Sequence, residues 1–97
     1  MEVKVHCKGF EIEAETIVDI RDSFECLSEY TNHTGRAEIS LEKEKDTYSV
    51  NLVIRSKNLP KAITIRRSGK DLFQLVELVS DHAHDGLGRK SYHRFRS

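Results

Sequence analysis

The pattern of apolar and polar residues changes its period several times along the chain. Four segments alternate apolar and polar residues, which is typical of strands with one buried face. Two longer segments, 16–30 and 72–87, repeat apolar residues every three or four positions, which predicts amphipathic helices. The alternating segments are residues 2–8, 37–42, 48–54 and 63–66. In chain order, the pattern predicts a strand, a helix, three strands and a second helix.

The starts of the two predicted helices have recognisable residues. Thr16 with Asp19, and Ser68 with Asp71, have the spacing of a capping box, with a start one turn earlier as the alternative for the first helix. Two glycines near the end of the second helix weaken its last turn, so we expect it to end at about residue 88. The apolar stripes consist of Ile17, Ile20, Phe24, Leu27 and Tyr30 in the first helix, and of Leu72, Val76, Val79, Ala83 and Leu87 in the second.

Two layers are enough to bury one apolar face per strand and one apolar stripe per helix. We therefore expect an α+β fold with the order β-α-β-β-β-α. In this fold both helices pack on one face of a four-stranded sheet, and the other face lies in water. The charged segment 43–47 is the expected hairpin connection. We expect a single domain over residues 1–90 and a basic C-terminal tail over residues 91–97.

The charge of the chain is unevenly distributed although it sums to zero. The 97 residues include 16 Lys or Arg and 16 Asp or Glu. Residues 1–54 hold six basic and twelve acidic residues, and residues 55–97 hold ten and four, so the halves carry −6 and +6. Such a field can steer a protein towards phosphate groups or an acidic surface. The alternative is that the two halves pack together and neutralise each other.

The sequence contains no motif of a known catalytic site. It lacks a P-loop, a glycine-rich dinucleotide motif, a nucleophile elbow and a zinc-protease motif. A hydrophobic fraction of 37% without tryptophan leaves little from which to build a deep pocket. We therefore expect no enzyme activity, no cofactor and no small-molecule substrate.

The histidines and cysteines lack the spacing of a metal site. His82 and His84 are two positions apart, which places them on different faces of a helix, and His93 lies further along the chain. We expect no bound metal. We expect Cys7 and Cys26 to be buried or half-buried free thiols, with a disulfide between them or a redox role as the alternatives.

The hydropathy of the chain gives an expectation about its location. No apolar segment approaches the ~20 residues needed to span a bilayer. The first residues alternate in polarity, unlike a signal peptide. We expect a soluble cytoplasmic protein without a membrane partner.

The C-terminal segment has the composition of a nucleic-acid contact. Its basic side chains can neutralise phosphates, and its aromatic rings can stack on unpaired bases. The outward positions of the strands add a second basic set, Lys4, Lys8, Arg55 and Arg66. The alternatives are an ordinary chain terminus and a solvated sheet face. The C-terminal residues in question are Arg89, Lys90, Tyr92, Arg94, Phe95 and Arg96.

Three short stretches carry a likeness to a known family. They are Val-Lys-Val-His-Cys-Lys-Gly-Phe-Glu-Ile at 3–12, Glu-Lys-Asp-Thr-Tyr at 44–48 and Asp-Leu-Phe at 71–73. Together with the two apolar stripes, they resemble the ribosome hibernation promoting factor / ribosome-associated translation inhibitor family. The stretches match its opening strand, the hairpin between its second and third strands, and the start of its second helix. The resemblance covers residue 1 to about residue 90 and is to the short form of the family.

The resemblance implies a domain that binds the small ribosomal subunit between head and body. There it would overlap the mRNA and tRNA sites and keep idle ribosomes inactive under stress. The implied partner is small-subunit rRNA rather than DNA, and a homodimer is allowed but not implied. Lys8 and Arg89 match basic positions of the family, whereas Arg66 and Arg67 are additions of this sequence. The predicted rRNA-binding residues are Lys8, Arg66, Arg67, Arg89, Lys90, Tyr92, Arg94, Phe95 and Arg96.

The first helix suggests an alternative function. At positions that are usually basic in the family, this helix has Ser23, Cys26 and Glu29. The alternative is a protein–protein adaptor on the same fold, whose acidic first helix binds a basic partner. The acidic residues that are expected to point outward are Asp19, Asp22, Glu25 and Glu29.

Overall fold

A computed structural model describes residues 2–31, 35–57 and 59–96, with all of their side chains except those of Tyr30 and residues 88–96. The order of its elements confirms the predicted β-α-β-β-β-α fold. A short 3-10 helix, η1, extends the first helix. The elements are β1 (Glu2–Lys8), α1 (Ala14–Glu25), η1 (Cys26–Thr31), β2 (Arg36–Glu44), β3 (Thr47–Arg55), β4 (Ile63–Gly69) and α2 (Leu72–Arg96).

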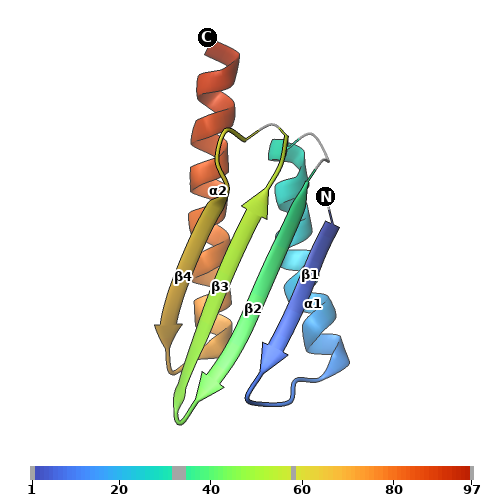
Figure 1. The fold of residues 1–97 in the computed structure, drawn as a ribbon, viewed down its shortest axis with the longest axis vertical. Helices are drawn as coiled ribbons and strands as arrows, with labels where there is room; N and C mark the ends of the chain where they lie inside the picture. Colours follow the sequence, from blue (N-terminus) through green and yellow to red (C-terminus); the bar gives the residue numbers. More distant parts are fainter. Residues whose placement is uncertain (1, 32–34, 58, 97) are drawn as a thin grey trace.

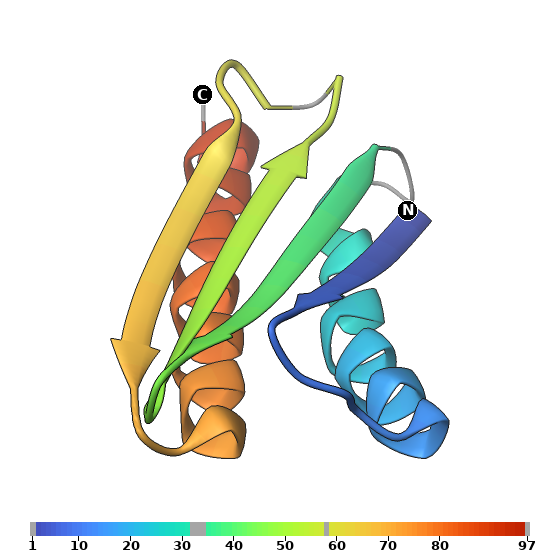
Figure 2. The same cartoon turned by 60° about the horizontal axis from the view of Figure 1, so that its bottom comes forward.

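The four strands form one mixed sheet in the order β1-β2-β3-β4. β1 is parallel to β2, and the other two pairs are antiparallel. A parallel pair needs a crossover connection, which α1 and η1 supply, whereas β2 and β3 are joined by a tight turn at 45–46. Both helices lie on the same face of the sheet, so the expected two layers are confirmed (Figures 1 and 2).

The core lies between the sheet and the two helices. The register aligns Val5, Ile39, Leu52 and Ile65 across all four strands on the helix-covered face. The predicted stripes are confirmed, except that Ile17 is only half-buried and that the Tyr30 side chain lies outside the described part of the structure. The buried helical residues are Ile20, Phe24 and Leu27 from α1 and η1, and Leu72, Leu75, Val76, Val79, Ala83 and Leu87 from α2.

Neither predicted capping box is present. α1 begins at Ala14, and no side chain caps its first turn. Ser68 belongs to β4, and its hydroxyl lies 3.3 Å from the Ser49 hydroxyl on the open face. Asp71 caps α2 by itself, because its carboxylate accepts a hydrogen bond from the Gln74 backbone N–H at 3.2 Å.

α2 is longer than predicted. We expected an end near residue 88, but the helix continues to Arg96 through most of the segment predicted as a tail. The cost of a glycine inside a helix is only ~1 kcal/mol, and the arginines and lysine that follow are good helix formers. The last turns extend past the end of the sheet (Figure 1).

Candidate nucleic-acid interface

The open face of the sheet carries two of the predicted contact residues, Lys8 and Arg66. Both are exposed. Lys8 pairs with Glu42 at the end of β1, and Arg66 pairs with Asn51 from β4. β1 and β4 are the two edges of the sheet, so β2 and β3 separate the two cations. The fold does not bring them together.

Arg67 lies on the opposite face from Arg66, because successive side chains of a strand alternate. Its Nη2 is 2.8 Å from His82 Nδ1 on α2. A guanidinium can only donate, so the His82 nitrogen accepts this hydrogen bond. Arg67 also donates to the Arg66 carbonyl oxygen at 2.8 Å. Arg67 is therefore held beside α2 and does not extend the open face.

The C-terminal basic and aromatic residues belong to the last turns of α2. Figure 1 shows that this end of α2 lies at the opposite end of the molecule from the end of β1, where Lys8 sits. The predicted contact residues therefore form no single cluster. The side chains of these C-terminal residues, Arg89, Lys90, Tyr92, Arg94, Phe95 and Arg96, lie outside the described part of the structure.

The two helical histidines have different neighbours, as their spacing predicts. His82 contacts Arg67, and His84 Nε2 lies 3.2 Å from Cys26 Sγ at the start of η1. Within the described residues, no group of three or more His, Cys, Asp or Glu side chains is placed to hold a metal ion.

Both cysteines are free thiols, but the expected burial was wrong. Cys7 and Cys26 are exposed. Cys7 comes at the end of an edge strand, and its thiol donates to the Phe10 carbonyl oxygen at 3.3 Å. Partial desolvation raises the pKa of the Cys7 thiol above its ordinary value.

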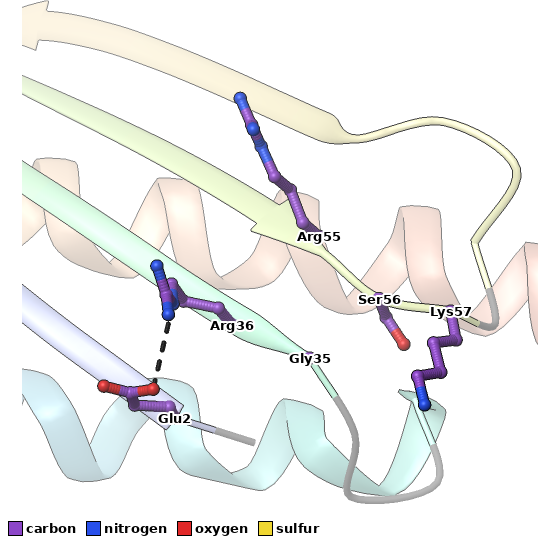
Figure 3. A pocket seen from close by; sticks show the side chains of 6 residues that line it. All are labelled: Glu2, Gly35, Arg36, Arg55, Ser56 and Lys57. Atoms are coloured by element: carbon purple, nitrogen blue, oxygen red, sulfur yellow. Dashed lines mark ion pairs between the residues drawn. The ribbon is translucent and has the colours of Figure 1, made fainter.

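A basic site lies at one end of the open face, and of its cations the sequence analysis had placed only Arg55 on that face. Arg36 on β2 is directly opposite Arg55 on β3. Together with Lys57 they border a shallow, open hollow (Figure 3). Both arginines project from the open face, whereas Lys57 points away from Arg55 past the strand ends. We call this site the arginine corner; its lining residues are Glu2, Gly35, Arg36, Arg55, Ser56 and Lys57.

The carboxylates beside the arginine corner neutralise it only in part. Arg36 lies 3.8 Å from Glu2 and 3.7 Å from Glu38, and Lys4 lies 3.4 Å from Glu2. Arg55 has no ion pair with any residue in the part of the chain that the structure describes. Two carboxylates thus lie beside four cations (Lys4, Arg36, Arg55, Lys57) and pair with Lys4 and Arg36 only.

The backbone fixes the arginine corner. Gly35 has a φ of 94°, a conformation that L side chains rarely adopt, and a Cβ on it would collide with the Arg55 carbonyl oxygen. The Glu2 N–H donates to the Gly35 carbonyl oxygen at 3.1 Å. Three strand ends are therefore held together directly beneath the two arginines.

The sequence does contain a signal for the arginine pair. A two-residue turn at 45–46 fixes the register of the hairpin, because it pairs Glu44 with Thr47 and each earlier residue with one correspondingly later. Counted back along both strands, this register pairs Arg36 with Arg55. The predicted strands stopped one residue short at each end, at Ala37 and Ile54. Arg55 was already placed outward, and extending the alternation by one position before Ala37 would have placed Arg36 outward as well.

None of the helices in the described residues is long and apolar enough to cross a membrane. This includes α2, which has 25 residues but carries charges throughout its length.

Comparisons with known proteins identify a fold. No protein-family model matches the chain, and no curated protein matches it. Its fold is similar to that of the Protein Y N-terminal domain from Thermus thermophilus, with a TM-score of 0.78, 14% identity and coverage of 92% of this chain and 98% of that chain. A ribosomal subunit interface protein from Coxiella burnetii is also similar, with a TM-score of 0.78, 12% identity and coverage of 92% and 96%. At this identity, the likeness concerns the fold alone.

Proposed function

We propose that this chain is a non-catalytic, ribosome-binding translation regulator. The observation that carries the proposal is the fold likeness, which spans 92% of this chain and at least 96% of each of the two neighbours. One of those neighbours is a ribosomal subunit interface protein. The family resemblance of the sequence supports the same function independently of the coordinates.

The finer part of the proposal concerns the place of binding. The chain binds small-subunit rRNA near the mRNA and tRNA sites and holds idle ribosomes inactive. Lys8, Arg66 and Arg67 neutralise rRNA phosphates. Because Lys8 and the end of α2 lie at opposite ends of a molecule 47 Å long, the contact runs along the whole length of the domain. From α2, Arg89, Lys90, Arg94 and Arg96 bind phosphates, and Tyr92 and Phe95 stack on bases.

Sedimentation on sucrose gradients tests the proposal. The purified protein is expected to migrate with the small subunit or the whole ribosome at low salt. If about five phosphates are neutralised, its affinity should fall by ~10²–10³ between low and physiological salt. Replacing Arg89, Lys90, Arg94 and Arg96 with Ala should abolish the association. Absence of migration with ribosomes at either salt concentration would contradict the proposal.

A protein–protein adaptor is the second candidate, and one observation favours it. Asp19, Asp22, Glu25 and Glu29 are all exposed, so α1 and η1 present an acidic surface. Such a surface is suited to a basic protein partner. Partners captured from a lysate should survive nuclease treatment if this function is correct, and all of them should be lost if RNA mediates the capture.

A further inference from the structure

The arginine corner contains a pair of like charges that destabilises the sheet. Like charges directly opposite each other destabilise an antiparallel strand pair. Arg36 and Arg55 are such a pair. The sheet would be relieved of this repulsion by an anion bound between the two guanidinium groups.

The carboxylates nearby do not provide that anion. Glu2 and Glu38 both lie beside Arg36, at 3.8 and 3.7 Å, close to the outer limit for an ion pair. These side chains are about half exposed, and pairs of this kind contribute little because water screens them. The charges of Arg55 and Lys57 are not neutralised by any carboxylate, since neither side chain forms an ion pair within the described residues.

The site is preorganised by the backbone. The close approach of Gly35 to the Arg55 carbonyl and the hydrogen bond from Glu2 to Gly35 fix the Cα positions of both arginines. A ligand therefore finds the two arginines already paired at the backbone and has only to order their side chains. Preorganisation of this kind lowers the entropic cost of binding.

The chemistry of the corner suits phosphate. A guanidinium presents a planar fork of N–H donors that matches two oxygens of a phosphate, and two forks can clamp one group. Beside the arginines, Val53 is half-buried and offers apolar surface in a smaller hollow that also includes Glu38. An RNA strand carries such phosphates on sugars that have an apolar edge.

We propose that Arg36, Arg55 and Lys57 form a binding site for phosphates of the RNA backbone. The two arginines bind one phosphate above the sheet, and Lys57 contacts a neighbouring one past the strand ends. The choice of RNA as the source of the phosphate rests on the proposed function. The site itself is independent of Lys8 and of the C-terminal residues of α2.

Fluorescence anisotropy with a labelled 12-nucleotide oligouridylate tests the site. For single strands, each phosphate contact contributes about 0.7 to the slope of log K against log salt, so Arg36→Ala/Arg55→Ala, which removes one phosphate contact, should lower that slope by about 0.7. At 0.1 M salt this corresponds to a roughly fivefold loss of affinity relative to the wild type. Glu38→Gln should tighten binding, because it removes a competing carboxylate.

A matched control removes two charges from the opposite end of the sheet. Lys45 and Lys70 are exposed in the turns after β2 and β4, so Lys45→Ala/Lys70→Ala changes the net charge equally without touching the corner. This variant should retain affinity within about 1.5-fold of the wild type. Equal losses in both double variants would mean that net charge alone attracts the RNA. Wild-type affinity in the arginine variant would overturn the site.

The same variants on ribosome gradients separate this inference from the proposed function. If the wild type and Arg36→Ala/Arg55→Ala migrate equally with ribosomes, the corner is not a contact and the proposed function stands. If the wild type binds the oligouridylate through the corner but does not migrate with ribosomes, the site stands and the proposed function is wrong. Loss of ribosome binding in the arginine variant only, with the lysine control intact, supports both.

Discussion

The two ends of the sheet are built in the same way but used differently. At each end, a glycine with positive φ lies against the carbonyl of a neighbouring strand: Gly9 against Lys43, and Gly35 against Arg55. At the first end, where β2 turns into β3, aromatic side chains pack against each other on the surface. The second end, the arginine corner, carries opposed like charges.

At the hairpin end, two aromatic rings and a lysine pack against one another. The rings of Phe10 and Tyr48 meet edge to face with centroids 5.3 Å apart, and Lys43 Nζ lies 5.2 Å from the centre of the Tyr48 ring. The lysine charge is thus satisfied by a neighbour on the same end. The comparison teaches that equal backbone constraint can support either packing contacts or a pair of opposed like charges, and the opposed like charges suggest a bound anion.

The largest effects are expected from breaking the two glycine contacts. Gly9→Ala and Gly35→Ala should each lower the free energy of unfolding by about 2–4 kcal/mol, because each adds strain at positive φ and a clash with a backbone oxygen. The melting temperature, followed by circular dichroism, should fall by roughly 10–20 °C. Below the melting temperature, only Gly35→Ala should weaken oligouridylate binding. Melting temperatures equal to that of the wild type would show that these close approaches are not required.

A smaller effect is expected from the aromatic pair of the hairpin end. Phe10→Leu removes the edge-to-face contact with Tyr48 and should destabilise the fold by about 0.5–1.5 kcal/mol in urea unfolding. Tyr48→Phe, which keeps the ring, is the matched control and should change stability less. RNA affinity should stay at the wild-type value in both variants. A loss of RNA affinity in Phe10→Leu would remove the distinction between the two ends.

Removing one charge from the arginine corner should stabilise the fold instead of destabilising it. Arg55→Thr removes the like-charge pair and keeps a residue suited to strands, so it should stabilise the fold by about 0.2–1 kcal/mol at low salt. The gain should vanish in 1 M salt, where the repulsion is screened. Arg66→Thr, which lies opposite Asn51, is the control and should give no such gain. Destabilisation by Arg55→Thr would show that the pair does not repel.

The smallest effect concerns Cys7, at the end of β1. Its raised pKa means that the folded protein holds the thiol proton more tightly than the unfolded chain, so less reactive thiolate forms at a given pH. In a Cys26→Ser background, iodoacetamide should therefore modify Cys7 more slowly near pH 8 in the folded protein than in urea. The difference should shrink as the pH rises through the raised pKa. An equal rate in the two states would contradict the shift.

Much of the fold could be predicted because the apolar period is unambiguous. The helical stripes through Phe24 and Val79, and the alternation around Leu52, place each element and its buried face. The end of α2 could not be placed, because two glycines favour an end and the basic residues after them favour continuation. Cys7 shares the period of Val3, yet it is exposed at the end of an edge strand.

The candidate site was less predictable because it depends on pairing. Alternation from Ile65 would have placed Arg67 on the helix-covered face, but its contact with His82 needs the packing of β4 against α2. Arg36 becomes part of a candidate site only because strand pairing places it opposite Arg55. The sequence identifies the single basic residues, whereas their contacts in space depend on strand pairing and on packing between elements.

Competition on the small ribosomal subunit tests the central claim most directly. The labelled protein is sedimented with empty small subunits and with subunits that already hold mRNA and initiator tRNA. The account predicts binding to the empty subunits and loss of binding to the occupied ones. Equal binding to both would contradict a site that overlaps mRNA and tRNA, and no binding to either would contradict ribosome binding itself.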